Sequence, residues 1–196
     1  SNEFTMLEFY RIEINIHQLM DEIVELLAAL GSSAPTKKLS YAQVFFEYSD
    51  IDILNSDIHD LKEITNSLGL NSDYEWIEDI QMLLFVHLIE PKLKEIPICL
   101  IYDFPKQQAA LAEIHGPIAH RFEMYMNGTE IANGYQEIQF ANDYRDRFNT
   151  ELNKRKALSK PFEFLDHAFL KDLEKGIPKC SGVAIGIERL YSLLSL

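Results

Sequence analysis

Cysteine is scarce in this sequence, which contains only Cys99 and Cys180. They lie in unrelated contexts, and no Cys or His accompanies either at the spacing of metal ligands. Disulfide frameworks and structural zinc sites need such companions, so neither is predicted. We expect two buried thiols.

Long apolar runs are also missing. No stretch approaches the ~18 apolar residues needed to cross a bilayer. Residues 1–4 lack the cationic and apolar regions of a signal peptide. We interpret the protein as cytoplasmic, with no membrane partner.

Two common kinds of catalytic motif are absent. No glycine-rich loop ends in Lys-Ser or Lys-Thr, which excludes a P-loop. The six histidines form no dyad or ligand pair, so Ser-His-Asp and Cys-His catalysis are not predicted. These histidines are His17, His59, His87, His115, His120 and His167.

Basic residues are outnumbered: 18 Lys and Arg face 31 Asp and Glu, giving a net charge of −13. This charge repels a phosphate backbone on average, and the one basic run is residues 153–156. Autonomous nucleic-acid binding is therefore disfavoured, although a local basic rim is compatible with an acidic body. An acidic site suits a cationic small substrate.

The length and apolar content are sufficient for a buried core, since 47% of the 196 residues are hydrophobic. We treat residues 1–196 as one domain. Residues 4–10 predict a strand already in progress at the first residue, so we expect the chain to begin inside a domain. Apolar residues three and four apart predict a helix over 15–30, ended by Gly31, with a loop over 32–38.

Helices dominate the next part of the chain. Three are predicted, over residues 40–47, 56–68 and 73–90. Ser56 and Asp57 are candidate caps of the second, and Glu90-Pro91 closes the third. We interpret residues 40–92 as a helical insertion.

The remaining part alternates in the manner of strands. An apolar run at 98–102 predicts one strand, and segments 121–126 and 130–138 flank Asn127-Gly128, a strong hairpin signal. Surface helices over 142–158 and 162–175, a strand over 182–187 and a final helix from Glu188 complete the predicted elements. This order indicates an α+β fold, an antiparallel sheet flanked by helices, rather than a doubly wound one.

Three acids on the predicted hairpin are candidate metal ligands: Glu123, Glu130 and Glu137, with Asn133 between them. Across a two-residue turn, Glu123 and Glu130 fall on roughly facing positions, where two carboxylates can share a divalent ion. The alternative is three solvated acids on an exposed sheet face, the ordinary case for carboxylates.

Gly182 and Gly186 lie four apart at a strand-to-helix junction. Glycines there let a ligand or another backbone approach closely, and Arg189 can offer a planar cation to a purine ring or phosphate. Alternatively, the glycines serve packing and Arg189 is a surface residue.

The first strand contributes Phe4, Glu8 and Tyr10, which alternation places on one face. They would present a stacking ring, an acid and a phenol together. The alternative is that both aromatics face the core and Glu8 is a satisfied buried acid.

Together and in this order, the three clusters resemble class II lysyl-tRNA synthetases. Residues 4–10 are similar to the strand leaving motif 2, residues 121–137 to the lysine- and metal-binding hairpin, and residues 182–190 to motif 3. The resemblance spans nearly the whole chain. It implies a class II synthetase-like antiparallel sheet with a helical insertion.

The resemblance also implies roles at the nucleotide end of the site. Phe4 and Arg189 sandwich the adenine of ATP, with Gly182 and Gly186 in the ATP site and Arg189 as the catalytic residue. Acidic ligands for Mg²⁺ against the phosphates are then Glu123 and Glu130.

At the amino-acid end, the resemblance implies that Glu137 and Tyr10 bind the ε-ammonium of a lysine-type substrate, with Glu8 nearby. Tyr135 lines the aliphatic stem and Asn133 meets the carboxylate end. A buried ammonium needs charge-compensating acceptors, and adenine needs flat apolar or cationic faces.

Three features resemble the branch of this family that modifies elongation factor P. They are residues 102–112, residues 177–182 and Ala184, which stands where the synthetases have glycine. A methyl group at that position reshapes the pocket around the amino group. In that branch it accompanies a preference for β-lysine over α-lysine, which we expect here.

The sequence also departs from the family pattern. It starts after the motif 2 arginine, and it lacks motif 1, which builds the dimer interface, and the anticodon-binding domain. Adenylation in this family works by positioning and by charge stabilisation at the α-phosphate, so losing that arginine weakens transition-state binding. We expect the isolated polypeptide to be inactive and the parent protein to be a homodimer.

Three functions remain open. The leading hypothesis is an ATP-dependent ligase that adenylates lysine or β-lysine and transfers it to a lysine of elongation factor P. A fragment of a lysyl-tRNA synthetase, with tRNA-Lys as the less favoured acceptor, is the second. A non-catalytic remnant that binds lysine or a nucleotide is the third.

Overall fold

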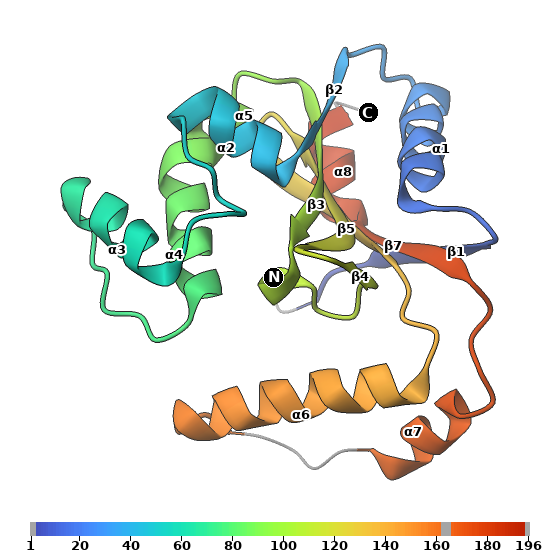
Figure 1. Ribbon diagram of the computed structural model, residues 1–196. Coiled ribbons are helices and arrows are strands. Elements are labelled where there is room, and N and C mark those ends of the chain that lie inside the picture. The colour runs from blue at the N-terminus through green and yellow to red at the C-terminus, as the bar shows by residue number, and fades with distance from the viewer. Residues whose placement is uncertain (1–2, 162–165, 195–196) are drawn as a thin grey trace.

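A mixed sheet forms the centre of the protein in the computed structural model, which describes residues 3–161 and 166–194 (Figure 1). Its strands run in the order β1-β7-β6-β5-β3-β2, with β4 paired to β5. All pairings are antiparallel except the parallel pair β2–β3. The strands are β1 (Met6–Ile12), β2 (Thr36–Ser40), β3 (Ile98–Pro105), β4 (Ile114–His115), β5 (Ile118–Met126), β6 (Thr129–Gln136) and β7 (Cys180–Gly186).

Helices flank this sheet, and the α+β prediction is confirmed. They are α1 (Ile16–Ala29), α2 (Tyr41–Ser49), α3 (Ile58–Ser67), α4 (Ile77–Leu84), the π-helical turn η1 (Phe85–Ile89), α5 (Glu90–Leu93), the 3-10 turn η2 (Lys106–Gln108), α6 (Ala141–Ala157), α7 (His167–Leu173) and α8 (Ile187–Leu194). Among the described residues, no helix is both long and apolar enough to traverse a bilayer. Cys99 and Cys180 are free and buried, as expected.

One face of the sheet packs against α1 and α8. The apolar side of α1, including Leu19 and Ile23, meets Val183 and Ile185 of β7, and Leu190 of α8 joins the same cluster. Helix α1 begins with a capping box at Asn15, whose side chain accepts from the backbone N–H of Gln18. The cap fixes the start of the helix, and burial of its apolar stripe fixes its seat on the sheet.

The opposite face is covered only in part, by the helical segment Tyr41–Leu93. Phe45 of α2 and Leu84 of α4 pack with Ile101 of β3 and Tyr125 of β5 in a second core. Helices occupy the three predicted regions, although the third begins at Ile77 rather than at residue 73, and Asp57 caps α3 as expected. Figure 1 shows this segment to one side of the sheet, which leaves β1, β7 and β6 outside its cover.

Two predictions around this segment are wrong. The loop expected at 32–38 contains the start of β2, which pairs with Ile98–Tyr102. Lys37 and Lys38 hide its strand pattern, since only Leu39 of β2 is buried. The third helix also does not end at Pro91: after η1 it continues to Leu93, because a proline fits in the first turn of α5.

The hairpin between β5 and β6 turns at Asn127-Gly128, as predicted. Both residues have positive φ, 48° and 78°, which suits a tight two-residue turn. A β-bulge follows, because Tyr125 pairs with Glu130 whereas Met124 pairs with Ala132. Ile131 is therefore an extra residue, and it enters the α1-side core together with Ala132.

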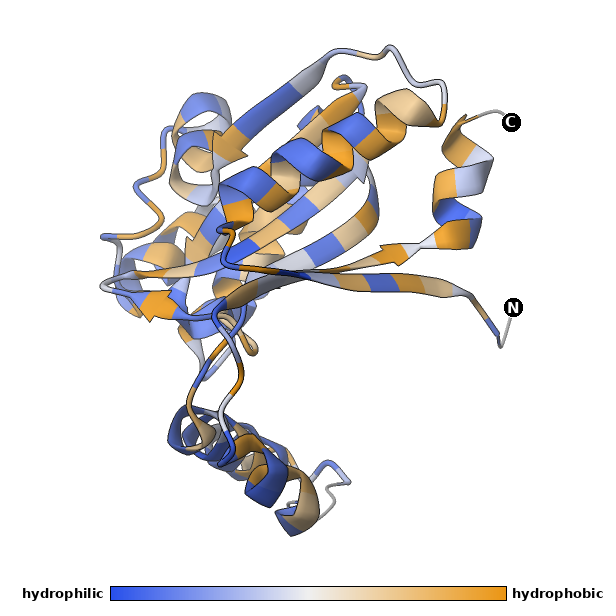
Figure 2. Cartoon of the chain, turned by 90° about the vertical axis from the view of Figure 1, so that its right-hand side faces the viewer, coloured by the Kyte–Doolittle hydropathy of each residue, from blue (hydrophilic) through white to orange (hydrophobic). Residues whose placement is uncertain are grey.

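Helices α6 and α7 lie apart from the sheet, and Figure 2 shows hydrophilic and hydrophobic residues mixed along them. Their small core contains Tyr144, Leu170 and Leu173 together with Ile138, which follows β6. Helix α7 begins later than the helix predicted over 162–175. Residues 162–165 of that prediction lie outside the described residues.

Candidate functional site

The candidate site lies on the sheet face opposite α1, where β1, β7 and β6 run side by side. Strand register fixes two rows across these strands. The first row consists of Tyr10, Gly182 and Tyr135, whereas the second consists of Glu8, Ala184, Asn133 and, on β5, Glu123. Three stretches that are distant in sequence therefore supply neighbouring positions on one face.

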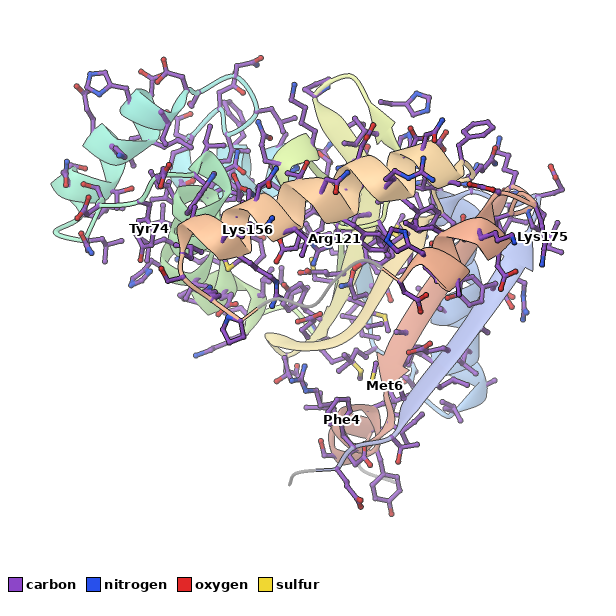
Figure 3. The ribbon with its side chains drawn as sticks, turned by 90° about the horizontal axis from the view of Figure 1, so that it is seen from below. Phe4, Met6, Tyr74, Arg121, Lys156 and Lys175 are labelled. Atoms are coloured by element: carbon purple, nitrogen blue, oxygen red, sulfur yellow. The ribbon has the colours of Figure 1, made fainter. Side chains whose placement is uncertain are left out.

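A pocket of about 410 Å³ opens beside the second row. Its walls come from the N-terminal segment, the hairpin and the β7–α8 junction. Six predicted site residues line it, namely Phe4, Glu130, Asn133, Ala184, Gly186 and Arg189. Phe4 and Met6 lie next to each other in Figure 3, and both belong to this pocket.

Two hydrogen bonds connect the segments that line this pocket near the β7–α8 junction. Arg189 Nη1 donates to the backbone carbonyl of Glu130 over 2.9 Å. The backbone N–H of Thr5 donates to the Glu188 carboxylate over 2.9 Å, which lowers the pKa of Glu188. Phe4 itself precedes β1 rather than lying within it, and 73% of its surface is exposed. Its ring is thus free to stack on a ligand.

Tyr10 and Glu137 meet over Gly182, at the other end of the face. A Cβ atom at Gly182 would lie 2.5 Å from Cε1 of Tyr10 and 2.8 Å from Oε1 of Glu137. The glycine is therefore required for this close approach. Glu137 follows β6, and its backbone N–H is held by the carbonyl of Cys180 over 3.0 Å.

Burial raises the pKa values of the two ionisable groups at this end of the face, Glu137 and Tyr10. It raises the pKa of Glu137 from 4.5 to about 7, because desolvation disfavours the charged form of the carboxyl. Desolvation also raises the pKa of Tyr10, with added repulsion from Glu137 and Glu8. A desolvated carboxyl of this kind is stabilised in its charged form by a cation placed against it.

The predicted facing register of Glu123 and Glu130 is wrong. Glu123 is opposite Asn133, whereas Glu130 is opposite Tyr125. The two acids nevertheless line a common pocket of about 260 Å³ next to the helical segment. The bulge at Ile131 accounts for this, because the extra residue lets Glu130 and Asn133 share a face although they are three residues apart.

Glu130 sits in an unfavourable field for a carboxylate. Desolvation raises its pKa, and repulsion from Glu123 raises it further. Among the described residues, no group of three or more His, Cys, Asp or Glu side chains is arranged to hold a metal on its own. Glu123 and Glu130 nonetheless line one pocket, and two carboxylates are a donor set that suits Mg²⁺, which takes one or two protein carboxylates plus phosphates and water.

Arg121 is a residue to which the sequence assigned no role. Its guanidinium forms an ion pair with Glu123, and its Nε donates to Asn133 Oδ1 over 3.3 Å. Asn133 Nδ2 in turn donates to the hydroxyl of Tyr135 over 3.1 Å. The position of Arg121, two residues before Glu123 on the same strand face, was the available signal.

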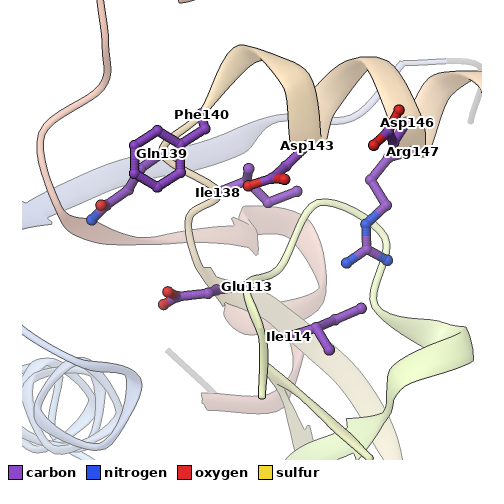
Figure 4. A pocket seen from close by; sticks show the side chains of 8 residues that line it. All are labelled: Glu113, Ile114, Ile138, Gln139, Phe140, Asp143, Asp146 and Arg147. Atoms are coloured by element: carbon purple, nitrogen blue, oxygen red, sulfur yellow. The ribbon is translucent and has the colours of Figure 1, made fainter. Parts of the chain in front are cut away.

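A separate pocket of about 350 Å³ lies between α6 and the segment before β4 (Figure 4). It contains none of the predicted site residues. Its lining consists of Glu113, Ile114, Ile138, Gln139, Phe140, Asp143, Asp146 and Arg147. This pocket is therefore separate from the candidate site.

Sequence comparison supplies the family. Residues 1–195 match the family described as "tRNA synthetases class II (D, K and N)". The chain belongs to this class II tRNA synthetase family. The antiparallel strands of the site and the β7–α8 junction are therefore those of a class II synthetase-type fold.

Individual relatives narrow the likeness within the class II family. Proteins named "Elongation factor P--(R)-beta-lysine ligase" from Proteus mirabilis, Photorhabdus laumondii and Erwinia tasmaniensis are 41%, 38% and 39% identical to this chain. Each match covers 97% of this chain and 61% of the relative. The chain thus spans about three fifths of the length of these curated relatives.

Proposed function

We propose that the protein carrying these 196 residues is a cytoplasmic, homodimeric ligase that uses ATP to attach a lysine-type amino acid to a lysine of elongation factor P. Residues 1–196 form part of its catalytic domain, with residues 40–92 as a helical insertion. The names of the relatives support the substrate pair. The observation that carries the proposal is the buried Glu137 carboxyl facing Tyr10 over Gly182, on the sheet face that also bears the Phe4–Arg189 pocket.

ATP is assigned to the pocket lined by Phe4, Gly186 and Arg189. An exposed aromatic ring and a guanidinium offer the two flat faces that adenine requires. Gly186 leaves the β7 end of this pocket open, whereas Gly182, which the resemblance assigns to the ATP site, lies under Tyr10 and Glu137 at the amino-acid end. Arg189 is assigned as the catalytic residue, which stabilises charge on the phosphates, and its guanidinium donates a hydrogen bond to the carbonyl of Glu130.

Mg²⁺ is assigned to Glu123 and Glu130. The raised pKa of Glu130 supports this, because a cation between the acids offsets their repulsion and the cost of desolvation. The ion would supply charge neutralisation at the phosphates of ATP.

The amino-acid substrate is assigned to the row that contains Gly182. Glu137 and Tyr10 receive the distal ammonium, with Glu8 adjacent on β1. Tyr135 packs against the aliphatic stem of the substrate, and Asn133 binds its carboxylate end. Ala184 is the last of the proposed substrate-binding residues. With its methyl group in the pocket wall, Ala184 favours β-lysine over α-lysine.

The reaction then has two steps. A carboxylate oxygen of the amino acid attacks the α-phosphorus of ATP, forming the aminoacyl adenylate and releasing pyrophosphate. The neutral amine of the acceptor lysine next attacks the activated carbonyl, forming an amide and releasing AMP and a proton. Orientation by Asn133 and charge stabilisation by Arg189 are the contributions of this chain.

Transfer assays test the proposal. The protein carrying these residues is incubated with ATP, Mg²⁺ and labelled β-lysine, with elongation factor P or tRNA-Lys as acceptor. We expect label on elongation factor P and none on its variant in which the acceptor lysine is replaced by arginine. Charging of tRNA-Lys without labelling of the protein would establish the lysyl-tRNA synthetase alternative. Absence of binding of ATP and of lysine would leave only a structural or vestigial role.

A further inference from the structure

Arg121 stands at the centre of a polar network that reaches beyond the candidate site. Besides its contacts with Glu123 and Asn133, its Nη1 donates to the backbone carbonyl of Gln108 over 2.9 Å. Its Cζ lies 4.7 Å from the centre of the Phe104 ring. The guanidinium is therefore held at its edges by hydrogen bonds and on one face by an aromatic ring. Because it is planar and rigid, its orientation determines where it contacts Glu123 and Asn133.

Gln108 connects this centre to the helical segment. Its Nε2 donates to Oε1 of Gln81 on α4 over 3.1 Å and to the hydroxyl of Tyr41 on α2 over 3.3 Å. Gln81 and Tyr41 are 2% and 1% exposed, so their polar atoms depend on partners within the protein. A continuous series of hydrogen bonds and one ion pair therefore connects α2 and α4, through Gln108 and Arg121, to Glu123 and Asn133.

We infer that the helical segment positions the metal- and carboxylate-binding side of the site through Gln108 and Arg121. Both are positioning residues: Gln108 holds Arg121, and Arg121 holds the carboxylate of Glu123 and the amide of Asn133. The consequence for metal binding rests on the proposed function, whereas the positioning itself is a property of the fold.

Packing alone does not require this network. Phe45, Leu84 and Ile101 already provide a buried apolar interface between the helical segment and the sheet. A polar network inside such an interface gains little stability over apolar side chains of similar size. It does fix orientation, and it ends on two site residues, as partners behind metal ligands do.

A pair of neighbouring substitutions separates positioning from packing. Gln108→Leu removes both hydrogen bonds to the helical segment and keeps the size of the side chain. Gln107→Leu is the matched control, because Gln107 lies on the same 3-10 turn and is exposed. If Gln108→Leu fails to fold, Tyr41→Phe removes one hydroxyl from the same network and replaces it in the test, with Tyr48→Phe on the same helix as its control.

Nuclear magnetic resonance of the Asn133 side-chain amide reads the positioning directly, without any ligand. We expect its signals, assigned with Asn133→Asp, to shift in Gln108→Leu and to stay in place in Gln107→Leu. Unchanged signals in Gln108→Leu would overturn the inference.

Magnesium titration of ATP binding reads the functional consequence. The apparent affinity for Mg²⁺ should fall about tenfold in Gln108→Leu and remain unchanged in Gln107→Leu, since partners behind metal ligands contribute that much. An unchanged Mg²⁺ affinity in Gln108→Leu would contradict positioning of the metal side. A wild-type protein that binds no ATP with Mg²⁺ would refute the proposed function, and the amide signals would still decide the positioning.

Discussion

Tyr10 of the edge strand β1 and Glu137, which follows β6, converge over Gly182 of the strand between them, β7. The space that a Cβ would take there is filled by the Tyr10 ring at 2.5 Å and the Glu137 carboxylate at 2.8 Å. A glycine that could have served packing alone therefore lets an acid and a phenol face the same point. This contact connects the motif 3-like strand to the amine end of the proposed site.

Gly182→Ala should displace Tyr10, because no real Cβ contact is that short. The ring belongs to an exposed edge strand and can swing away, so we expect a loss of only about 1 kcal/mol of unfolding free energy. Affinity for β-lysine should fall at least about tenfold, since small misplacements are costly in a preorganised site. Thermal melts and calorimetry measure the two effects.

Gly186→Ala is the control for folding in this experiment. A Cβ there meets nothing closer than Arg189 Cδ at 3.8 Å, an ordinary contact. Equal destabilisation of both variants would contradict the geometry over Gly182.

Ionisation of Glu137 should make stability depend on pH. Its pKa is about 7 in the fold and near 4.5 when unfolded, so the unfolded chain loses this proton first as the pH rises. Stability should decline between pH 4.5 and 7 by up to about 3 kcal/mol, less any solvent screening. Urea titrations across this range should show that Glu137→Gln flattens that part of the profile. A profile that Glu137→Gln leaves unchanged would contradict the raised pKa.

Glu130→Gln should weaken Mg²⁺ binding in the presence of ATP by at least about tenfold, as it removes a proposed ligand where even outer partners matter that much. The substitution also removes the repulsion with Glu123, so the variant should be no less stable than wild type. Glu113→Gln, in the separate pocket, is the matched control. Comparable Mg²⁺ affinities in Glu130→Gln and Glu113→Gln would exclude Glu130 as a ligand.

Arg189→Ala should lower ATP affinity roughly tenfold, because a desolvated cation–π contact contributes about 1–2 kcal/mol. Binding of β-lysine alone should change little. The partly exposed Arg145 on α6, which lies outside the candidate site, provides the control substitution Arg145→Ala. Calorimetry that finds the two variants equal would leave no role for Arg189 in the nucleotide pocket.

Ala184→Gly should shift substrate preference toward α-lysine. Removing one methyl group from a pocket wall alters discrimination by about 10- to 200-fold. The measurement is the ratio of kcat/KM values for β-lysine and α-lysine in pyrophosphate exchange. An unchanged ratio would mean that other residues read the position of the amino group.

Local signals predicted the elements that local chemistry controls. Asn127-Gly128 marked the hairpin because both turn positions need positive φ, and Asp57 marked the start of α3 because its side chain caps backbone N–H groups. Strand β2 was not predicted, because its lysines break the apolar pattern of a strand and are accommodated only by tertiary contacts. One such contact is the 2.6 Å ion pair between Lys37 and Glu47.

The residues of the candidate site were proposed from the family resemblance, whereas the strand register that places them was not predicted. The bulge at Ile131 adds one residue to β6, and no turn residue in the sequence marks it. Strand pairs counted from the turn at Asn127-Gly128 are therefore wrong by one residue beyond the bulge. Gln108 and Arg121 were missed for a different reason. The side chain of Gln108 contacts Gln81 and Tyr41, 27 and 67 positions away in the sequence, and no local pattern encodes such contacts. Arg121 offered only its position two residues before Glu123, which does not reveal its hydrogen bond to the carbonyl of Gln108.

Calorimetric titration of Glu137→Gln at pH 8 tests most directly whether one sheet face holds both a nucleotide and an amine. In the wild-type protein carrying these residues, we expect both ATP with Mg²⁺ and β-lysine to bind. Glu137→Gln should retain ATP binding and lose β-lysine binding, because the neutral amide cannot compensate a buried ammonium. Wild-type affinity for β-lysine in Glu137→Gln would contradict the account.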